Sequence, residues 1–560
     1  FKEAISSDTT MNTVQHLRDI TDKHCKISGM TATLLDTRDL SNSEVAIYVV
    51  IAVVLCLIVL EIALDSYVAP ILLLANIGIA ILYNMGTNIF LGEISYITKA
   101  ISAVLQLGVT MDFAIFLYHS YQAELKNTTD RNQAMSIAIS KTFTSVLGSS
   151  LTTIAGFLAL CSMNLTLGKD IGIVMAKGVL FGVISVVTIL PSLILMFDKA
   201  IQKTKHKELL PKFTTISEFN IKHYKAIIVI FLIALPIALY GYNNTKVYYK
   251  LDSSLPETLD SISANNTLKD KFELVSQEMI LINKDTPNDE INEMLDKIEE
   301  LDGVDFTLSY SKLSELGIPE EMLPEDLLSI FQSDKYQMIL INSKYEIATD
   351  ELNNQIAKIN EIVKQYDSNA KVVGEGPLMK DLVEISDHDF NSVNTVSIGI
   401  IFVIMMFVLK SISLPVLLVI AIEFAIFINM GIPYYTNTTI PFIASIVIGT
   451  IQLGATIDYA ILITTKYIQN RKDGKDKKQA VSEALGTSIN SIIVSGLCFF
   501  GATFGVGAYS KIEMIGSLCT LMSRGAIISV IVVITVLPAF LMIFDKLVCK
   551  TTIGMREVKN

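Results

Sequence analysis

The sequence predicts a polytopic α-helical membrane protein with two parallel repeats and an α+β domain outside the membrane. Composition is the first observation behind this fold class: 51% of the 560 residues are hydrophobic and 18% are charged, which is unusual for a soluble chain of this length. Long uncharged segments are the second. The third is a pair of near-identical stretches, QLGVTMDFAI and QLGATIDYAI, which begin at Gln106 and Gln452.

Eleven segments are apolar and about 20 residues long, the length that a helix needs to cross the hydrocarbon core of a bilayer. They lie near residues 44–64, 68–90, 96–118, 145–163, 171–197, 224–243, 392–410, 413–432, 439–465, 488–508 and 514–544. No Walker A or dinucleotide-binding fingerprint occurs, and neither the six cysteines nor the six histidines show zinc-ligand spacing. We therefore expect no ATP-driven pumping, metal site or bound cofactor.

The positions of lysine and arginine predict the orientation. Basic residues gather in the connection over 198–223, in the connection after Tyr467 and in the tail over 545–560, and basic connections mark the cytoplasmic side of a membrane protein. The insert over 244–391 is then extracytoplasmic. Its first 147 positions, 244–390, carry 31 Asp and Glu against 13 Lys and Arg, which indicates a solvated outer domain, with a cation-binding surface as the alternative. No nucleic-acid partner is expected.

The near-identical stretches belong to a longer duplication with an offset of 346 residues. The further matches are Ser145 with Ser491, Ser149 with Ser495 and, after a one-residue slip, LPSLILMFDK at 190–199 with LPAFLMIFDK at 537–546. An odd number of crossings separates the copies, so the repeats run parallel, and parallel repeats place a working site at their interface.

The two repeats differ in what precedes them. The second follows a span and a large outer domain, whereas the first follows a short segment that resembles the end of that domain. We therefore expect a first span and most of a first outer domain to be missing from this chain. The predicted organisation is a remnant of the first outer domain over 1–43, first-repeat helices over 44–197, a cytoplasmic linker over 198–223, a connecting span over 224–243, the second outer domain over 244–391, second-repeat helices over 392–544 and a cytoplasmic tail over 545–560.

The outer domain is predicted to contain two βαβ units, the split arrangement of ferredoxin-like folds. The strand-like run MILIN occurs twice, at 279–283 and 338–342. An amphipathic helical stretch and a second strand follow each copy, over 288–301 and 304–310 in the first unit and over 350–366 and 371–374 in the second. Between the units, 316–331 is predicted to be a helical insertion with turn-forming prolines.

Each repeat places one carboxylate in an apolar helix, Asp112 in the first and Asp458 in the second. An ionisable group near the bilayer centre costs roughly 2.5–3.5 kcal/mol, so two at matched positions indicate a shared use. Gly108 and Gly454 precede them by four residues, on the same helix face, where a small residue allows another helix to approach. If these two helices cross there, the carboxylates are neighbours in a dry core. Desolvation and repulsion then favour their protonated forms, and the two groups titrate as one unit.

Small polar residues near the aspartates are candidates to carry hydrogen bonds or water to the pair, with ordinary helix packing as the alternative. They are Gln106, Gln452, Thr110, Thr456, Ser149 and Ser495.

In its duplicated unit of one helix, an α+β outer domain and five helices, the chain resembles the resistance-nodulation-division (RND) superfamily of secondary transporters. Gly-x-x-x-Asp followed by an aromatic residue, as in Asp112–Phe113 and Asp458–Tyr459, resembles the MMPL family within it. The resemblance implies a transporter rather than an enzyme, with both aspartates and Tyr459 as its proton relay. Phe113 lacks the hydroxyl of the family's Asp-Tyr pair, so the relay is not expected to be symmetric.

The resemblance also implies export of lipids or other hydrophobic or amphiphilic molecules across the bacterial cytoplasmic membrane, by proton antiport with Na⁺ as the alternative coupling ion. Multidrug efflux and Patched-like sterol or lipid handling are alternatives within transport. A SecDF-like translocation accessory and a non-transporting membrane scaffold are alternatives of other classes. The cargo and the oligomeric state, monomer or trimer, stay open.

Three further charges lie within predicted spans. Glu423 is either a second titrating site or a residue facing a water-filled vestibule. Lys177 and Arg524 are matched between the repeats, and they either extend to the outer headgroups or act as counter-charges to the aspartates. The connectors over 129–144 and 475–487 are predicted to be amphipathic helices lying on the cytoplasmic face.

Overall fold

The computed structural model describes residues 3–21, 25–207, 214–249, 255–272, 275–315 and 331–555. The chain divides into two compact units, and helices α2 and α13 contribute residues to both. We call Phe1–Arg38 with Tyr248–Asp387 the α/β unit, and Asp39–Val247 with His388–Asn560 the helical unit. Each unit is described by itself.

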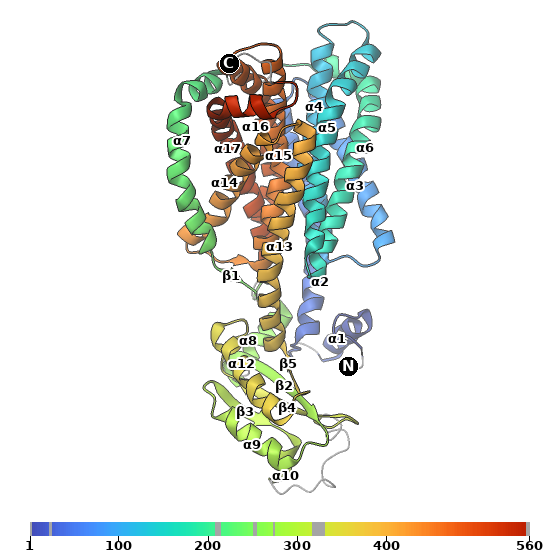
Figure 1. The fold of residues 1–560 in the computed structure, drawn as a ribbon. Helices are drawn as coiled ribbons and strands as arrows, with labels where there is room; N and C mark the ends of the chain where they lie inside the picture. The colour runs from blue at the N-terminus through green and yellow to red at the C-terminus, as the bar shows by residue number, and fades with distance from the viewer. Residues whose placement is uncertain are drawn as a thin grey trace. The chain divides into compact units, whose positions relative to one another are not determined.

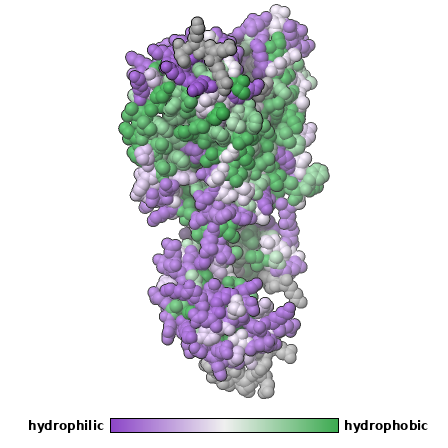
Figure 2. Space-filling view, in the orientation of Figure 1, coloured by the Kyte–Doolittle hydropathy of each residue, from purple (hydrophilic) through white to green (hydrophobic). Residues whose placement is uncertain are grey.

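Eleven helices in the described part of the chain are long and apolar enough to cross a membrane, as the sequence predicts. Hydrophobic residues form a band across the helical unit, with hydrophilic residues beyond it on either side (Figure 2). The helices are α2 (Met30–Ala63), α3 (Val68–Gly86, extended by the 3₁₀ turn η1, Thr87–Leu91), α4 (Tyr96–Glu124), α5 (Arg131–Ala159, followed by η2, Leu160–Ser162), α6 (Thr166–Lys203), α7 (Thr214–Asn243), α13 (Glu375–Leu409), α14 (Ser413–Tyr435), α15 (Phe442–Lys472), α16 (Lys477–Tyr509) and α17 (Glu513–Thr551).

The connectors over 129–144 and 475–487 are largely helical, as predicted, but the prediction that they are separate helices on the surface is wrong. Their residues form the first turns of α5 and α16, which continue unbroken into the spans. Asp130 and Asp476 start these helices as N-caps, accepting hydrogen bonds from the N–H groups of Asn132 at 2.9 Å and Gln479 at 2.7 Å. No proline or other break separates the polar turns from the apolar ones, so one helix results.

The helical unit contains two groups of packed helices, α3 to α6 and α7 with α14 to α17. They meet where α4 packs on α16 and α15 packs on α5 (Figure 1). At two glycines a further helix approaches each group: Gly505 of α16 faces Ile51 of α2, and Gly148 of α5 faces Val408 of α13. Each of these four contacts, α4 with α16, α15 with α5, α2 with α16 and α13 with α5, joins a helix of the first repeat to a helix of the second.

The α/β unit contains a four-stranded antiparallel sheet in the order β3-β4-β2-β5. The two MILIN runs lie on its central strands and pair with each other, so that Ile280 faces Ile339 across the ladder. The elements follow one another as β2 (Ser276–Asn283), α9 (Asn288–Glu299), β3 (Val304–Leu308), α10 (Tyr310–Glu315), β4 (Tyr336–Ser343), α12 (Asp350–Tyr366) and β5 (Lys371–Gly374).

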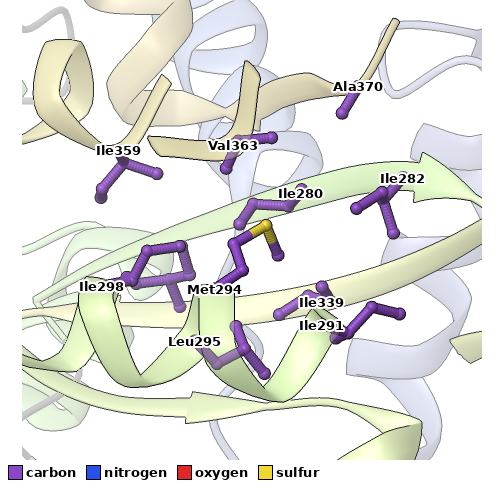
Figure 3. Close-up of a cluster of buried hydrophobic side chains, with 11 residues drawn as sticks. Ile280, Ile282, Ile291, Met294, Leu295, Ile298, Ile339, Ile359, Val363 and Ala370 are labelled. Carbon is purple, nitrogen blue, oxygen red and sulfur yellow. The ribbon is translucent and has the colours of Figure 1, made fainter. Parts of the chain in front are cut away.

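The core of this unit lies between the sheet and helices α9 and α12 (Figure 3). Alternate residues of β2 and β4 point into it, and α9 contributes residues spaced as one helical face. The core residues are Ile280, Ile282, Ile291, Met294, Leu295, Ile298, Ile339, Ile341, Ile359, Val363 and Ala370.

Residues from the start of the chain belong to this same unit. Helix α1 (Asp8–Thr21) packs on the first turns of α2, where Arg18 forms an ion pair with Asp36 at 2.6 Å. Asp36 also accepts the N–H of Ser261, at the start of α8 (Asp260–Phe272), at 3.0 Å. Strands β1 (Val247–Tyr248) and β6 (Ile440–Pro441) form a separate two-stranded ladder. The helix predicted over 316–331 lies outside the described residues except for Phe331, which is buried.

Candidate functional site

The two aspartates lie in α4 and α15, the most enclosed of the eleven spans. Asp112 and Asp458 are each 2% exposed. Both helices are surrounded by other helices of the unit, because each contacts helices of its own repeat and also packs on the opposite repeat, α4 mainly on α16 and α15 on α5. The sequence thus places one carboxylate from each repeat in the interior of the helical unit.

Each carboxylate finds its hydroxyl partners on the opposite repeat. Asp112 interacts with Ser495 of α16, because α4 packs on α16. Asp458 accepts a 3.4 Å contact from the Thr153 hydroxyl of α5 and lies near Ser149 of the same helix, whose Oγ has no hydrogen-bond partner among the described residues. The serine of each repeat therefore lies beside the aspartate of the other repeat.

The carboxylates are incompletely satisfied. Atom Oδ1 of Asp112 and atom Oδ1 of Asp458 have no hydrogen-bond partner among the described residues, and Asp458 is an electrostatic neighbour of Asp112. Neither aspartate forms an ion pair with a described lysine, arginine or histidine. Buried polar groups in native proteins normally have partners, and exceptions at matched positions point to a functional reason.

The two glycines do not face each other as the expected helix crossing required. Gly108 faces Phe499 of α16, and a methyl group at Gly108 would lie 2.6 Å from the ring. Gly454 faces the backbone of Thr153 and Gly156 in α5. Each glycine thus admits a helix of the opposite repeat, and α4 meets α15 through these neighbours rather than at a direct crossing.

Tyr459 lies near both carboxylates. Its hydroxyl is 3.4 Å from the Ser495 hydroxyl, and it interacts electrostatically with Asp112 and Asp458. Phe113, its counterpart, is fully buried and supplies no polar atom. Tyr459 therefore places a phenol next to the two aspartates, whereas the matched position in the first repeat, Phe113, does not.

The threonines and glutamines near the aspartates form contacts of their own. Thr110 and Thr456 each donate to the backbone oxygen four residues earlier, Gln106 and Gln452 respectively, at 2.7 Å. The Gln106 side chain accepts from Asn84 of α3 at 2.8 Å. The remaining contacts of this second layer are Gln106 to the Gly178 oxygen, Asn429 to Gln452, and Gln452 to Ser529 and to the Gly525 oxygen. This layer joins α4 to α3 and α6, and α15 to α14 and α17.

The other three membrane charges lie away from the aspartates' hydrogen-bond partners. Lys177 donates to Asn88 at 2.5 Å, and Arg524 donates to the side-chain and backbone oxygens of Asn429 at 2.9 and 2.7 Å. Glu423 is 8% exposed, and its Oε1 has no hydrogen-bond partner among the described residues. Its electrostatic neighbour is Tyr242 at the end of α7.

Sequence reasoning missed several residues of these layers. Thr153 has no signal, because its counterpart in the repeat is Phe499. Asn84 and Asn429 do have one: they make the same bond to matched glutamines and differ from the repeat offset by one residue. A search that allowed a one-residue slip in α3 and α14 would have found them.

Eleven apolar helices in the described part of the chain, which enclose a pair of carboxylates, are the features of a multi-pass membrane protein. A family model described as the MMPL family matches residues 3–216 and 289–553. The match covers most of the chain, so the chain belongs to the MMPL family of membrane transporters.

Three curated relatives illustrate the similarity. ActII-3, a membrane protein of Streptomyces coelicolor, is 24% identical over 510 residues, which cover 87% of this chain and 68% of ActII-3. The apo-petrobactin exporter of Bacillus anthracis is 22% identical over 532 residues, 86% of this chain and 68% of the exporter. The mycolic acid-containing lipids exporter MmpL11 of Mycolicibacterium smegmatis is 23% identical over 185 residues, 32% of this chain and 19% of MmpL11. The alignments thus cover about two thirds or less of each relative.

Proposed function

We propose that the protein is a secondary transporter, driven by the proton-motive force, that exports lipids or other hydrophobic or amphiphilic molecules across the bacterial cytoplasmic membrane. The observation that supports this proposal most strongly is that each aspartate interacts with a helix of the opposite repeat. Asp112 interacts with α16 and Asp458 with α5, so a change of charge on either group acts on the packing between the repeats. A carboxylate with only a structural role would not need this arrangement twice.

Proton binding supplies the coupling. A carboxyl that gains a proton loses its charge and becomes a hydrogen-bond donor, which changes its contacts with Ser495 or with Thr153. One charge that crosses a potential of 100 mV brings about 2.3 kcal/mol, enough to change the ratio of two conformations roughly fiftyfold. We assign Asp112, Asp458 and Tyr459 to the relay and Ser149 and Ser495 to its hydrogen bonds. Sodium is the alternative coupling ion, and the proposal needs no cofactor.

The proposal places the α/β unit outside the cytoplasm, following the positions of lysine and arginine in the connections. A ferredoxin-like fold for the unit is supported by the order β2-α9-β3-β4-α12-β5 and by the antiparallel sheet. Two parallel repeats are supported by the matched bonds of Asn84 with Gln106 and of Asn429 with Gln452.

The relatives' names suggest two kinds of cargo. MmpL11 is named for lipids that contain mycolic acid, which fits the first proposal. The apo-petrobactin exporter aligns over 86% of this chain against 32% for MmpL11, and this favours export of a non-lipid small molecule as the second candidate function.

The test compares cells that carry wild type, Asp112→Asn, Asp458→Asn or Thr456→Val at equal membrane levels. Mass spectrometry would measure surface lipids, secreted lipids and small molecules in the medium. We expect either Asn variant to lose one lipid class. Thr456→Val should keep it, because that hydroxyl donates within its own helix. Loss of a non-lipid compound alone would support the second candidate. Identical profiles in all four strains would reject transport and favour the scaffold.

A further inference from the structure

His119 lies on α4 seven residues after Asp112, two helical turns or about 10 Å further along the axis. Its Nδ1 atom is 3.2 Å from the Ser491 hydroxyl of α16. Ser491 lies one turn before Ser495 on α16, and Ser495 interacts with Asp112. The interface of α4 and α16 therefore carries a carboxyl, two hydroxyls and an imidazole in succession.

The surroundings of His119 contain both signs of charge. Asp65, in the connection after α2, and Lys466 of α15 both act on the ring electrostatically, and the side chain of Tyr118 is its aromatic neighbour on α4. Lys466 is held by the Thr487 carbonyl of α16 at 2.9 Å. His119 is partly buried and lies near the end of α4, which ends at Glu124.

Asp458 has no such group at the corresponding place. The counterpart of His119 in the second repeat is Thr465, whose hydroxyl donates to the Ile461 carbonyl of its own helix at 2.9 Å. A threonine hydroxyl has no second site that can take up a proton, whereas an imidazole can accept a proton on one ring nitrogen and release one from the other. The imidazole therefore makes the two repeats chemically different at this level.

We propose that His119 and Ser491 form the proton path between Asp112 and the side of the membrane that carries the basic connections, which makes His119 a relay residue in addition to the aspartates. This inference rests on the proposed function. The gap between Ser495 and Ser491 is one helical turn, about 6 Å along the axis, and one water molecule can span it.

The transfer conserves protons and involves no redox change. The Asp112 carboxyl releases its proton to the Ser495 hydroxyl or to the bridging water, and the Ser491 O–H passes a proton to Nδ1 of His119. The ring then releases the proton on Nε2 to solvent, and Ser491 regains one from the water. One proton leaves Asp112 and one reaches the solvent, and a rotation of the ring by about 180° then turns an unprotonated nitrogen toward Ser491 again.

The test measures proton flux into liposomes that contain the purified protein and the pH dye pyranine, with the membrane potential clamped by valinomycin and potassium. The variants are Asp112→Asn, His119→Gln, His119→Ala and Ser491→Ala. The matched controls are the repeat counterparts, Thr465→Ala and Ser145→Ala. We expect Asp112→Asn to abolish the flux, and His119→Gln and Ser491→Ala to slow it roughly tenfold or more. Both controls should keep the wild-type rate.

Chemical rescue separates a relay role from a packing role. Imidazole added to His119→Ala should restore the flux and should leave Asp112→Asn inactive. Flux at the wild-type rate in His119→Gln, or a slow His119→Ala that imidazole does not restore, would overturn the inference while the proposed function stands. A wild-type protein with no more flux than Asp112→Asn would instead reject the proposed proton coupling itself.

Discussion

Gly108 and Gly454 hold matched positions in the sequence, but their neighbours are different atoms. A methyl group on Gly108 would lie 2.6 Å from the Phe499 ring, whereas one on Gly454 would lie 3.6 Å from the nearest atom, the Thr153 carbonyl oxygen. The first distance requires Phe499 to move within a packed interior, and the second is ordinary contact. The same motif residue therefore has a strict size limit in one repeat only.

Gly108→Ala should destabilise the protein by roughly 1–3 kcal/mol, the usual range for overpacking in a core, and Gly454→Ala by less than about 0.5 kcal/mol. Thermal unfolding of the detergent-solubilised protein, followed by size-exclusion fluorescence, measures both. Adding Phe499→Leu should recover part of the loss at Gly108, because the shorter side chain can yield. Equal losses for the two alanine variants would show that the packing at the glycines has been misjudged.

Glu278 in the α/β unit is a buried carboxyl among apolar residues. It lies on β2 on the same face as Ile280, and its Oε2 has no hydrogen-bond partner among the described residues. Burial raises the pKa of Glu278 to about 7, although a hydrogen bond from Ser276 opposes the shift. The native fold therefore holds this glutamate in its protonated form more strongly than the unfolded chain does.

The stability of the α/β unit should consequently fall as pH rises from about 4.5, the ordinary pKa of glutamate, to about 7. In that window the unfolded state has already lost the proton and the folded state has not, and above it the loss is complete. Glu278→Gln should remove this dependence, with a gain on the order of 3 kcal/mol at pH 8 and little change at pH 4.5. Hydrogen exchange of the β2 and β4 amides, corrected for intrinsic rates, measures the effect. Equal protection of variant and wild type at pH 8 would contradict it.

The residues of the candidate site could be predicted where the sequence itself distinguishes them from their neighbours. Asp112 and Asp458 are evident because they are charges in apolar runs, and Ser149 and Ser495 follow from the offset of the repeat. The position of each serine beside the aspartate of the other repeat could not be predicted, because it depends on which helices pack together. Thr153 illustrates the limit: it contacts Asp458 at 3.4 Å, but nothing in the sequence connects the two residues.

At the scale of elements, spans were predicted well because length and hydropathy determine them. The starts of α5 and α16 were not predicted correctly, because a polar stretch of sequence can form either a separate surface helix or the first turns of a span. Two strands of the α/β unit were predictable from the apolar, isoleucine-containing MILIN runs, which occur twice. Their direct pairing, with Ile280 opposite Ile339, was not, because it depends on a connection of more than fifty residues between the strands.

In each repeat, a carboxylate on the first span accepts hydrogen bonds from the backbone just before a helix of the other repeat. Asp389 of α13 accepts the N–H groups of Asn164 and Leu165 at 2.9 and 3.1 Å, directly before α6. Glu44 of α2 accepts the N–H of Lys511 at 3.3 Å, directly before α17. Free N–H groups at a helix start favour negative charge. The first span of each repeat thus makes the same kind of contact with the start of the last helix of the other repeat.

Asp389→Ala should destabilise the protein by roughly 2 kcal/mol, because it leaves two N–H groups without their acceptor. Glu44→Ala should cost less, since its contacts with Lys511 are longer. Thermal unfolding gives the size of the effect, and faster hydrogen exchange at Asn164 and Leu165 would locate it. Thr395→Ala is the control, because this α13 side chain is exposed. A loss in the control as large as that in Asp389→Ala would show that the carboxylate contact is not the cause.

For the whole molecule, the aspartate pair opposes stability. Buried polar atoms without partners cost roughly 1–3 kcal/mol each, and the helical unit contains such atoms on Asp112 and Asp458. Packing elsewhere must offset this cost. A fold that only needed to be stable would have apolar residues at these positions, so the excess cost belongs to the function.

Asp112→Asn and Asp458→Asn should therefore abolish transport and at the same time stabilise the protein by roughly 1 kcal/mol, as neutralised functional sites often do. Asp198→Asn provides the contrast, because that carboxylate pairs with Arg131 at 2.9 Å and accepts from Tyr121 at 3.0 Å, and its loss should lower stability. Melting temperatures of the three variants, measured beside cargo export from the same cells, decide the matter. A pair kept for structure would lose stability in all three variants, and a relay would lose export and gain stability only at Asp112 and Asp458.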